Sequence, residues 1–225
     1  MARAARGERP RLSARERRKY LPATLTPEDR ARQLRSLRRG TKRPRVESFA
    51  SRPSRWTTEF RRRFGRPVTD TAFVDRHLLR RPGIRAVLRR GRAAYYTGGS
   101  RPNQTPQSWA RARLASVLLN GPARKADADI WAAHSVASER GLYEPFVATT
   151  AKGKKYSVYV RRGGRRRLIH FGALGYEHFR DTHGAYAHMD HGDEARRRNY
   201  YSRHGPERDR NSARYWSHRV LWPRD

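Results

Sequence analysis

The stretch Lys155-Tyr156-Ser157-Val158-Tyr159-Val160-Arg161-Arg162-Gly163-Gly164-Arg165-Arg166-Arg167-Leu168-Ile169-His170-Phe171 decides the fold class of this 225-residue chain. Residues 155–160 alternate in the manner of a strand, and residues 167–171 give a matching second strand. Between them, Arg162-Gly163-Gly164-Arg165 is a turn signal. The stretch therefore predicts a β-hairpin that ends at Gly172 and Gly175.

Upstream of the hairpin, every predicted element is a helix. Thr26 is the expected N-cap of a helix that has Pro27 in its first turn and ends at Gly40. Further helices are expected over residues 56–64, from a cap at Thr69, over 82–90 with Gly91 as the stop, over 107–119, and over 123–137. These signals predict an all-α block.

Downstream of the hairpin, residues 176–222 are rich in His, Arg, Tyr and Trp. We expect them to be helical or irregular and to wrap against the hairpin. The predicted class is α+β. The predicted organisation is a disordered basic arm over residues 1–19, an all-α domain over 20–140, and a basic domain over 141–225 with the hairpin and helical or irregular segments.

The charge of the chain is its main functional signal. It has 53 Lys and Arg against 20 Asp and Glu, a formal net charge of +33. Such a charge repels itself unless a counter-charge neutralises it, and nucleic acid is the commonest polyanion. DNA is favoured over RNA as the partner, and acidic virion proteins are the alternative. No stretch is apolar enough to cross a bilayer, so no membrane partner is expected.

The absence of cysteine narrows the chemistry further. It excludes disulfides, cysteine zinc sites and thiol catalysis. Gly98-Gly99-Ser100 precedes a predicted helix, but no Walker lysine follows, which argues against nucleotide hydrolysis. A binding function is favoured over an enzymatic one, and no catalytic residue or cofactor is predicted.

Residues 94–106 combine aromatic, basic and amide side chains with Gly and Pro. Tyr95, Tyr96, Arg101 and Asn103 are predicted to form a loop that binds an anionic, flat ligand. The competing interpretation is that the tyrosines turn inward and the polar residues cap the next helix, with Thr105 as the cap.

Other basic residues extend the predicted nucleic-acid surface. A hairpin tip projects into solvent, and a second cluster lies beside tyrosines that can stack on bases. Trp216 and Trp222 are expected in the core. The remaining predicted nucleic-acid contacts are Arg111, Arg165, Arg166, Arg167, Arg196, Arg197, Arg198 and Arg203.

Residues 178–194 concentrate histidine and carboxylate side chains. His188, Asp190 and His191 are a minority candidate for a metal site, which would suit a one-metal nuclease. Their spacing matches no known metal signature. The alternative is a solvated polar loop, made flexible by Gly184 and Gly192.

Six stretches of the chain carry a resemblance to known families. They are Tyr95-Tyr96-Thr97-Gly98-Gly99-Ser100-Arg101-Pro102-Asn103-Gln104-Thr105, Ser108-Trp109-Ala110-Arg111-Ala112-Arg113-Leu114-Ala115-Ser116, Tyr156-Ser157-Val158-Tyr159-Val160, Phe171-Gly172-Ala173-Leu174-Gly175-Tyr176, Asn199-Tyr200-Tyr201-Ser202-Arg203-His204 and Tyr215-Trp216-Ser217-His218-Arg219-Val220-Leu221-Trp222. They resemble uncharacterised families of nucleocytoplasmic large DNA viruses, the giant viruses of protists and algae. In those families lysine is common where this chain has arginine, and serine is usual in place of Thr97. The resemblance covers roughly residues 20–135 and 150–222.

The resemblance implies a viral setting and assigns no activity to any residue. We therefore expect a basic viral protein that binds genome DNA through phosphates without strong sequence specificity. Its expected location is the virion interior, or the host cytoplasm or nucleus during infection. A minor capsid or internal virion protein that binds acidic subunits is one alternative, and the one-metal nuclease is the other.

Overall fold

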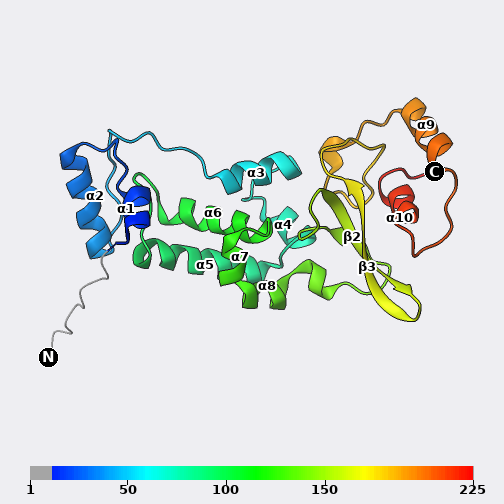
Figure 1. Cartoon of the computed structure of the whole chain (residues 1–225), viewed down its shortest axis with the longest axis horizontal. Coiled ribbons are helices and arrows are strands. Elements are labelled where there is room, and N and C mark those ends of the chain that lie inside the picture. Colours follow the sequence, from blue (N-terminus) through cyan, green and yellow to red (C-terminus); the bar gives the residue numbers. More distant parts are fainter. Residues whose placement is uncertain (1–11, 225) are drawn as a thin grey trace.

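A computed structural model describes residues 12–224. Figure 1 shows an elongated molecule with α1 and α2 at one end and the sheet, α9 and α10 at the other. Helices and strands together confirm the predicted α+β class. The elements are α1 (Ala14–Tyr20), α2 (Pro27–Arg39), α3 (Arg55–Phe64), α4 (Thr71–His77), α5 (Arg81–Thr97), α6 (Pro106–Leu118), α7 (Pro122–Ala126), α8 (Ala128–His134), the 3-10 helix η1 (Val136–Glu139), β1 (Phe146–Val147), β2 (Lys154–Arg162), β3 (Arg165–Ala173), the 3-10 helix η2 (Ala187–Met189), α9 (Glu194–His204) and α10 (Ala213–Val220).

The predicted disordered arm over residues 1–19 is wrong from residue 14 onward, because α1 begins there. Ser13 caps this helix, and Glu16 returns a hydrogen bond to the Ser13 backbone in a capping box. Tyr20 and Leu21 then pack with Leu37 of α2 in a small apolar cluster. Residues 1–11 lie outside the described part of the chain, so the prediction of disorder is untested there.

Three of the predicted helices follow their capping signals. The Thr26 side chain caps α2, and Gly40 ends it with a φ of 62°. Helix α3 matches the helix expected over residues 56–64. Helix α6 matches the one expected over 107–119, and Thr105 caps it with Ser108 in a capping box.

Two further helix predictions need correction, one at its cap and one in its length. The cap of α4 is Asp70 and not Thr69, because the Asp70 carboxylate accepts a hydrogen bond from the Phe73 amide at 3.0 Å. The single helix expected over residues 123–137 is instead α7, α8 and η1. The first break falls at Asp127, whose buried carboxylate binds the Arg113 guanidinium at 2.7 and 2.8 Å.

Helix α5 does not stop at Gly91, as the sequence predicts, but continues to Thr97. A Cβ at position 91 would lie 2.6 Å from the Ala110 Cα of α6. Glycine is therefore required here for the close packing of two helices and not as a helix end. The extra turns bring Tyr95 and Tyr96 into the helix.

The three strands form one antiparallel sheet in the order β1-β2-β3. Its hairpin confirms the prediction, with β2 and β3 joined by Gly163 and Gly164. Helix α10 packs against β3, as expected for the downstream segment. Among residues 12–224, no helix is both long and apolar enough to span a membrane.

The main hydrophobic core is continuous across the predicted domain boundary at residue 140. Phe60 and Phe64 of α3 belong to the same buried cluster as Tyr156 and Phe171 of the sheet. Trp216 is buried in this cluster, and Trp222 packs at its edge. The helical half and the sheet therefore support each other through shared apolar contacts.

Candidate anion-binding surfaces

Five arginines flank the two-residue turn at the tip of the β2–β3 hairpin. They are Arg161 and Arg162 before the turn and Arg165, Arg166 and Arg167 after it. Gly163 and Gly164 have φ angles of 55° and 72°, the left-handed region that a tight hairpin turn of this kind requires. The register pairs Arg161 with Arg166 and Arg162 with Arg165 directly across the strands. Two neighbouring pairs of like charges therefore face each other across the strands.

Two of the five tip arginines have structural partners. The Arg166 guanidinium lies 3.7 Å from the centre of the Tyr159 ring and donates to the Arg140 carbonyl at 2.8 Å. Arg162 donates to the Asn211 carbonyl at 2.8 Å.

The other three arginines, Arg161, Arg165 and Arg167, are exposed, and their side chains have no hydrogen-bond or ion-pair partner within residues 12–224. The predicted contacts at Arg165 and Arg167 thus lie on an accessible surface. Arg161, which the sequence prediction missed, joins them.

Helix α5 presents a second basic surface that the sequence prediction missed. Arg85, Arg89 and Arg92 are exposed at positions i, i+4 and i+7, which places them on one face of the helix. Within the described chain none of the three pairs with a carboxylate. The periodicity was readable in the sequence, but only the continuation of α5 past Gly91 makes it a single straight row.

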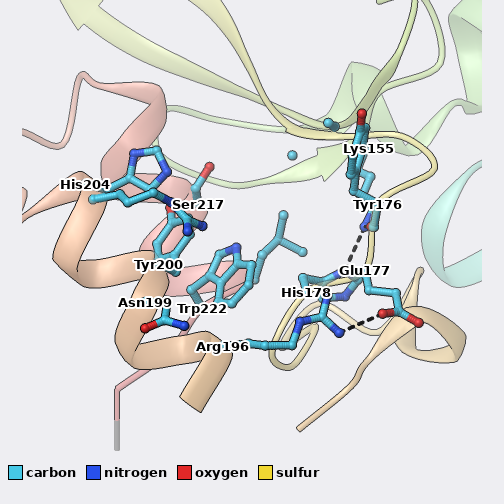
Figure 2. Close-up of a pocket in the computed structure, with 14 residues that line it drawn as sticks. Lys155, Tyr176, Glu177, His178, Arg196, Asn199, Tyr200, His204, Ser217 and Trp222 are labelled. Carbon is cyan, nitrogen blue, oxygen red and sulfur yellow. Dashed lines mark hydrogen bonds and ion pairs between the residues drawn. The ribbon is translucent and has the colours of Figure 1, made fainter. Parts of the chain in front are cut away.

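A pocket of about 610 Å³ lies between the sheet and helices α9 and α10. Figure 2 shows Arg196, Asn199 and His204 on one wall, with Lys155 and His178 on the other. Helix α9 places its residues 196, 199 and 203 on one face, so that all three reach the pocket.

The charged side chains in the pocket wall are mostly basic. Arg203 is exposed and has no partner within the described residues, whereas Arg196 forms an ion pair with Glu177 at 2.8 Å. Lys155 also lines the pocket but is only 1% exposed. The accessible charge of the wall is therefore that of two arginines and the Glu177 carboxylate.

A buried chain of polar groups supports Lys155. Its ammonium donates to the Tyr176 carbonyl and lies 2.7 Å from His178 Nδ1, and His178 Nε2 lies 2.8 Å from an Asp190 carboxylate oxygen. Burial lowers the pKa of Lys155 to about 8. Burial and then the nearby Lys155 lower the pKa of His178 to about 4. Neutral His178 accordingly accepts from Lys155 through Nδ1, and Asp190 Oδ1 accepts from the Asp181 amide at 2.9 Å.

The minority metal candidate is not supported by the geometry. His188 packs beside Gly65, Asp190 accepts from the Asp181 amide at 2.9 Å, and the His191 ring accepts from the Asp193 amide at 2.9 Å. Throughout residues 12–224, no three His, Cys, Asp or Glu side chains lie together in a way that would hold a metal ion.

The segment is instead ordered by the buried carboxylate of Asp181. This carboxylate accepts from the Tyr156 hydroxyl at 2.5 Å and from the Tyr186 amide at 2.6 Å. The solvated loop that was the alternative to a metal site is therefore also wrong for Asp181, which is buried.

Tyr95 lies inside the protein and does not form the predicted stacking surface. Its side chain is 0% exposed. The hydroxyl donates to the Gln104 carbonyl and accepts from the Arg43 amide, both at 2.8 Å. The Arg43 guanidinium lies 4.8 Å from the ring centre. The inward-facing interpretation is therefore correct for Tyr95.

Asn103 also has a structural role in place of the predicted binding role. Its amide accepts from the Val46 amide and donates to the carbonyls of Val46 and Phe49, each at 2.8 Å. Tyr96 remains 37% exposed at the end of α5, and Arg101 is exposed in the following turn. Only these two of the four predicted loop residues are accessible to a ligand.

The remaining predicted contacts lie on two helices. Arg111 is exposed on α6, and Arg198 is exposed on α9. Arg197 is held by Glu194 at 2.8 Å and by the Pro223 carbonyl at 2.9 Å, so its role is structural. The structure therefore groups Arg196 and Arg203 at the pocket and separates them from the hairpin tip.

A family model matches residues 18–132, just over half of the chain, and its description is "Family of unknown function (DUF5824)". The chain belongs to the DUF5824 family. No curated protein and no solved structure matches the chain.

The DUF5824 match spans α2 to nearly the end of α8, and it includes the row of arginines on α5. It ends before β1. Both the hairpin tip and the pocket lie outside the part of the chain that defines the family.

Proposed function

We propose that this protein binds nucleic acid through arginine contacts to phosphates, with little sequence preference. The observation that carries this proposal is the hairpin tip, where Arg161 faces Arg166 and Arg162 faces Arg165. Like charges directly opposite each other destabilise a strand pair. A polyanion bound at the tip would neutralise this repulsion, and the exposed side chains would gain charge-assisted hydrogen bonds.

The row on α5 supports the same proposal. Arg85, Arg89 and Arg92 follow one another along a helix face, and a row of cations suits a track of phosphates better than a single small anion. Contacts to phosphates position a protein on nucleic acid but carry no sequence information. Low sequence preference follows from this type of contact.

The proposed ligand is the DNA genome of a large DNA virus, with DNA favoured over RNA. The resemblance to giant-virus families supports this setting, and the net charge of +33 supports packaging with a polyanion. The proposed location is the virion interior, or the host cytoplasm or nucleus during infection.

The test is a salt series of binding to duplex DNA, single-stranded DNA and RNA by fluorescence anisotropy. The variant Arg161→Gln with Arg165→Gln and Arg167→Gln should weaken duplex binding. It should also reduce the slope of log K against log salt by about 1 for each lost phosphate contact, or about 3 in total.

The matched control removes the same net charge from arginines that already have acidic partners. Arg62, Arg66 and Arg81 pair with Glu59, Asp70 and Asp75. Their replacement by Gln should leave the salt slope close to that of the unmodified protein. Equal losses in both triple variants would reduce the effect to net charge alone, and no binding at low salt would refute the proposal.

The alternative partner is an acidic virion protein. Particles treated with nuclease and then with high salt distinguish the two partners. Release of the protein together with the genome supports DNA binding. Retention in genome-depleted particles would favour the structural role.

A further inference from the structure

We propose that one face of α5 binds a single strand of nucleic acid, with its arginine row on the phosphates and a base stacked on Tyr96. The arginine row is Arg85, Arg89 and Arg92. This inference rests on the proposed function, because it assumes that the chain binds nucleic acid, and it adds which form of nucleic acid this surface takes. The surface lies within residues 18–132, the part of the chain that matches the DUF5824 family.

Tyr96 continues the arginine row along the same face of the helix. Counted from Arg85, the row occupies positions i, i+4 and i+7, and Tyr96 is at i+11. At 3.6 residues per turn these four positions point within about 60° of one another and extend over about 16 Å of the helix. The three arginines are exposed, and Tyr96 is 37% exposed, whereas its neighbour Tyr95 is buried. The helix therefore directs Tyr95 into the core and Tyr96 toward the ligand surface.

The charge of α5 is left unneutralised only along this face. The helix contains five arginines and no acidic residue. Arg81 pairs with Asp75, and Arg90 pairs with Asp127 and Asp129. The arginine row has no carboxylate partner among the residues that the structure describes. Like charges at i, i+3 and i+4 repel each other along a helix, and bound phosphates would remove this repulsion.

The exposed ring of Tyr96 favours a single strand over a duplex. In a duplex the faces of the bases are stacked on one another, and a protein meets phosphates and base edges. In a single strand the base faces are accessible and stack on aromatic side chains beside a basic track. A strand whose phosphates follow the row can place a base on Tyr96, whereas a duplex would leave the ring unused. At about 3.4 Å per nucleotide, the face holds about four or five nucleotides.

The other side of α5 fixes this face in position before any ligand binds. Figure 1 shows α5 beside α6 along the length of the molecule. Ile84 and Val87 are buried on the packed side, and a Cβ at Gly91 would lie 2.6 Å from the Ala110 Cα. The spacing of the arginines along the helix is therefore set by the fold. Preorganised donors lose less entropy on binding than mobile ones do.

The first experiment compares a labelled ten-nucleotide single strand with the duplex of the same sequence, by fluorescence anisotropy of the full chain. Tyr96→Leu removes the ring but keeps an apolar side chain. It should weaken single-strand binding about tenfold, because base stacking is lost, and should leave duplex binding within about twofold. Tyr96→Trp should restore single-strand binding, because a tryptophan ring also stacks on a base.

The matched control is Tyr176→Leu. Tyr176 is 73% exposed in the segment after β3 and lies outside α5. This variant should bind the single strand within about twofold of the unmodified protein. Equal weakening by Tyr96→Leu and Tyr176→Leu would overturn the inference, and so would equal weakening of single-strand and duplex binding by Tyr96→Leu.

A second experiment tests the arginine row and separates this inference from the proposed function. Replacement of all three row arginines by Gln should reduce the slope of log K against log salt for the single strand by about 2, at about 0.7 for each lost contact. In the triple variant of the hairpin tip, Tyr96→Leu should still weaken single-strand binding. Failure of the chain to bind either form at low salt refutes the proposed function. Binding of both forms with no effect of Tyr96→Leu overturns the single-strand surface alone.

Discussion

Residues 95–103 and the hairpin tip both look like nucleic-acid contacts in the sequence, but the structure treats them in opposite ways. Tyr95 is buried and bonded to Arg43, and Asn103 is bonded to the backbone of Val46. At the tip, Arg165 and Arg167 are exposed and have no partner among residues 12–224. The two regions share composition but differ in whether a second segment of the chain covers them.

The same contrast applies to arginine itself. Arg43 and Arg124 are buried, where they donate to backbone carbonyls and lie over the rings of Tyr95 and Trp131. A buried guanidinium of this kind stabilises the fold and is unavailable to a ligand. The net charge therefore overestimates the number of arginines that can bind a ligand. The role of each arginine follows from the groups that it contacts.

The largest expected effect is that of Tyr95→Ala. Loss of a fully buried aromatic side chain should reduce the free energy of unfolding by about 3–5 kcal/mol. Urea denaturation measures this loss, and DNA affinity of the folded protein should be unchanged. Near-native stability with lost affinity would instead return Tyr95 to the binding surface and remove the contrast between the two regions.

The next largest effect should come from Gly91→Ala. The added methyl would lie 2.6 Å from the Ala110 Cα, and a backbone atom cannot swing aside. Helices α5 and α6 must separate, at an expected cost of about 1–3 kcal/mol in the free energy of unfolding.

Gly141→Ala is the control for this substitution, because its nearest neighbour would lie 3.6 Å away. It should leave the free energy of unfolding within about 1 kcal/mol of the unmodified protein. Similar losses at Gly91 and Gly141 would contradict the packing explanation for the length of α5.

These positions also explain where sequence-based prediction succeeds and fails. Local signals were sufficient for α2, with Thr26 and Gly40 at its ends, and for the hairpin with its Gly-Gly turn. They fail at Gly91, because a glycine that ends a helix and one that admits a neighbouring helix look alike until Ala110 is placed.

The candidate pocket shows the same limitation. Lys155 lies in a predicted strand, and only the fold brings it to His178 and Arg196. Arg196 and Arg203 were both predicted as contacts, but nothing in their spacing indicates a shared pocket with a lysine some forty residues earlier. Exposure of the hairpin tip was predictable because it depends on a local turn.

A fall in pH should destabilise the fold through its buried histidines and leave the exposed arginines unchanged, and this effect should be smaller than those of the substitutions above. The pKa values of His77 and His178 are lowered from 6.5 to about 4, mainly by burial. The unfolded chain therefore binds more protons than the folded one between pH 6.5 and 4. Stability is full above pH 6.5 and falls as the pH drops toward 4.

The expected loss is about 1 kcal/mol for each of the two histidines between pH 6.5 and 5.5. Urea denaturation at both pH values measures it, and His77→Gln should reduce the difference by about 1 kcal/mol. Arginine does not titrate in this range, so the DNA affinity of the folded protein at the hairpin tip should hold. A free energy of unfolding that is flat or rises on acidification would contradict the assignment of buried neutral histidines.

The smallest expected change in stability belongs to Tyr96→Ala combined with Arg101→Ala, which removes the two accessible residues of the first region. Tyr96 is 37% exposed and meets Tyr95 edge to face, and Arg101 is exposed, so the free energy of unfolding should fall by under about 1 kcal/mol. If Arg101 contacts a phosphate, the slope of log K against log salt should fall by about 1. An unchanged slope would leave Arg101 without a phosphate contact, whereas a loss of several kcal/mol would show that even the exposed residues of this region belong to the fold.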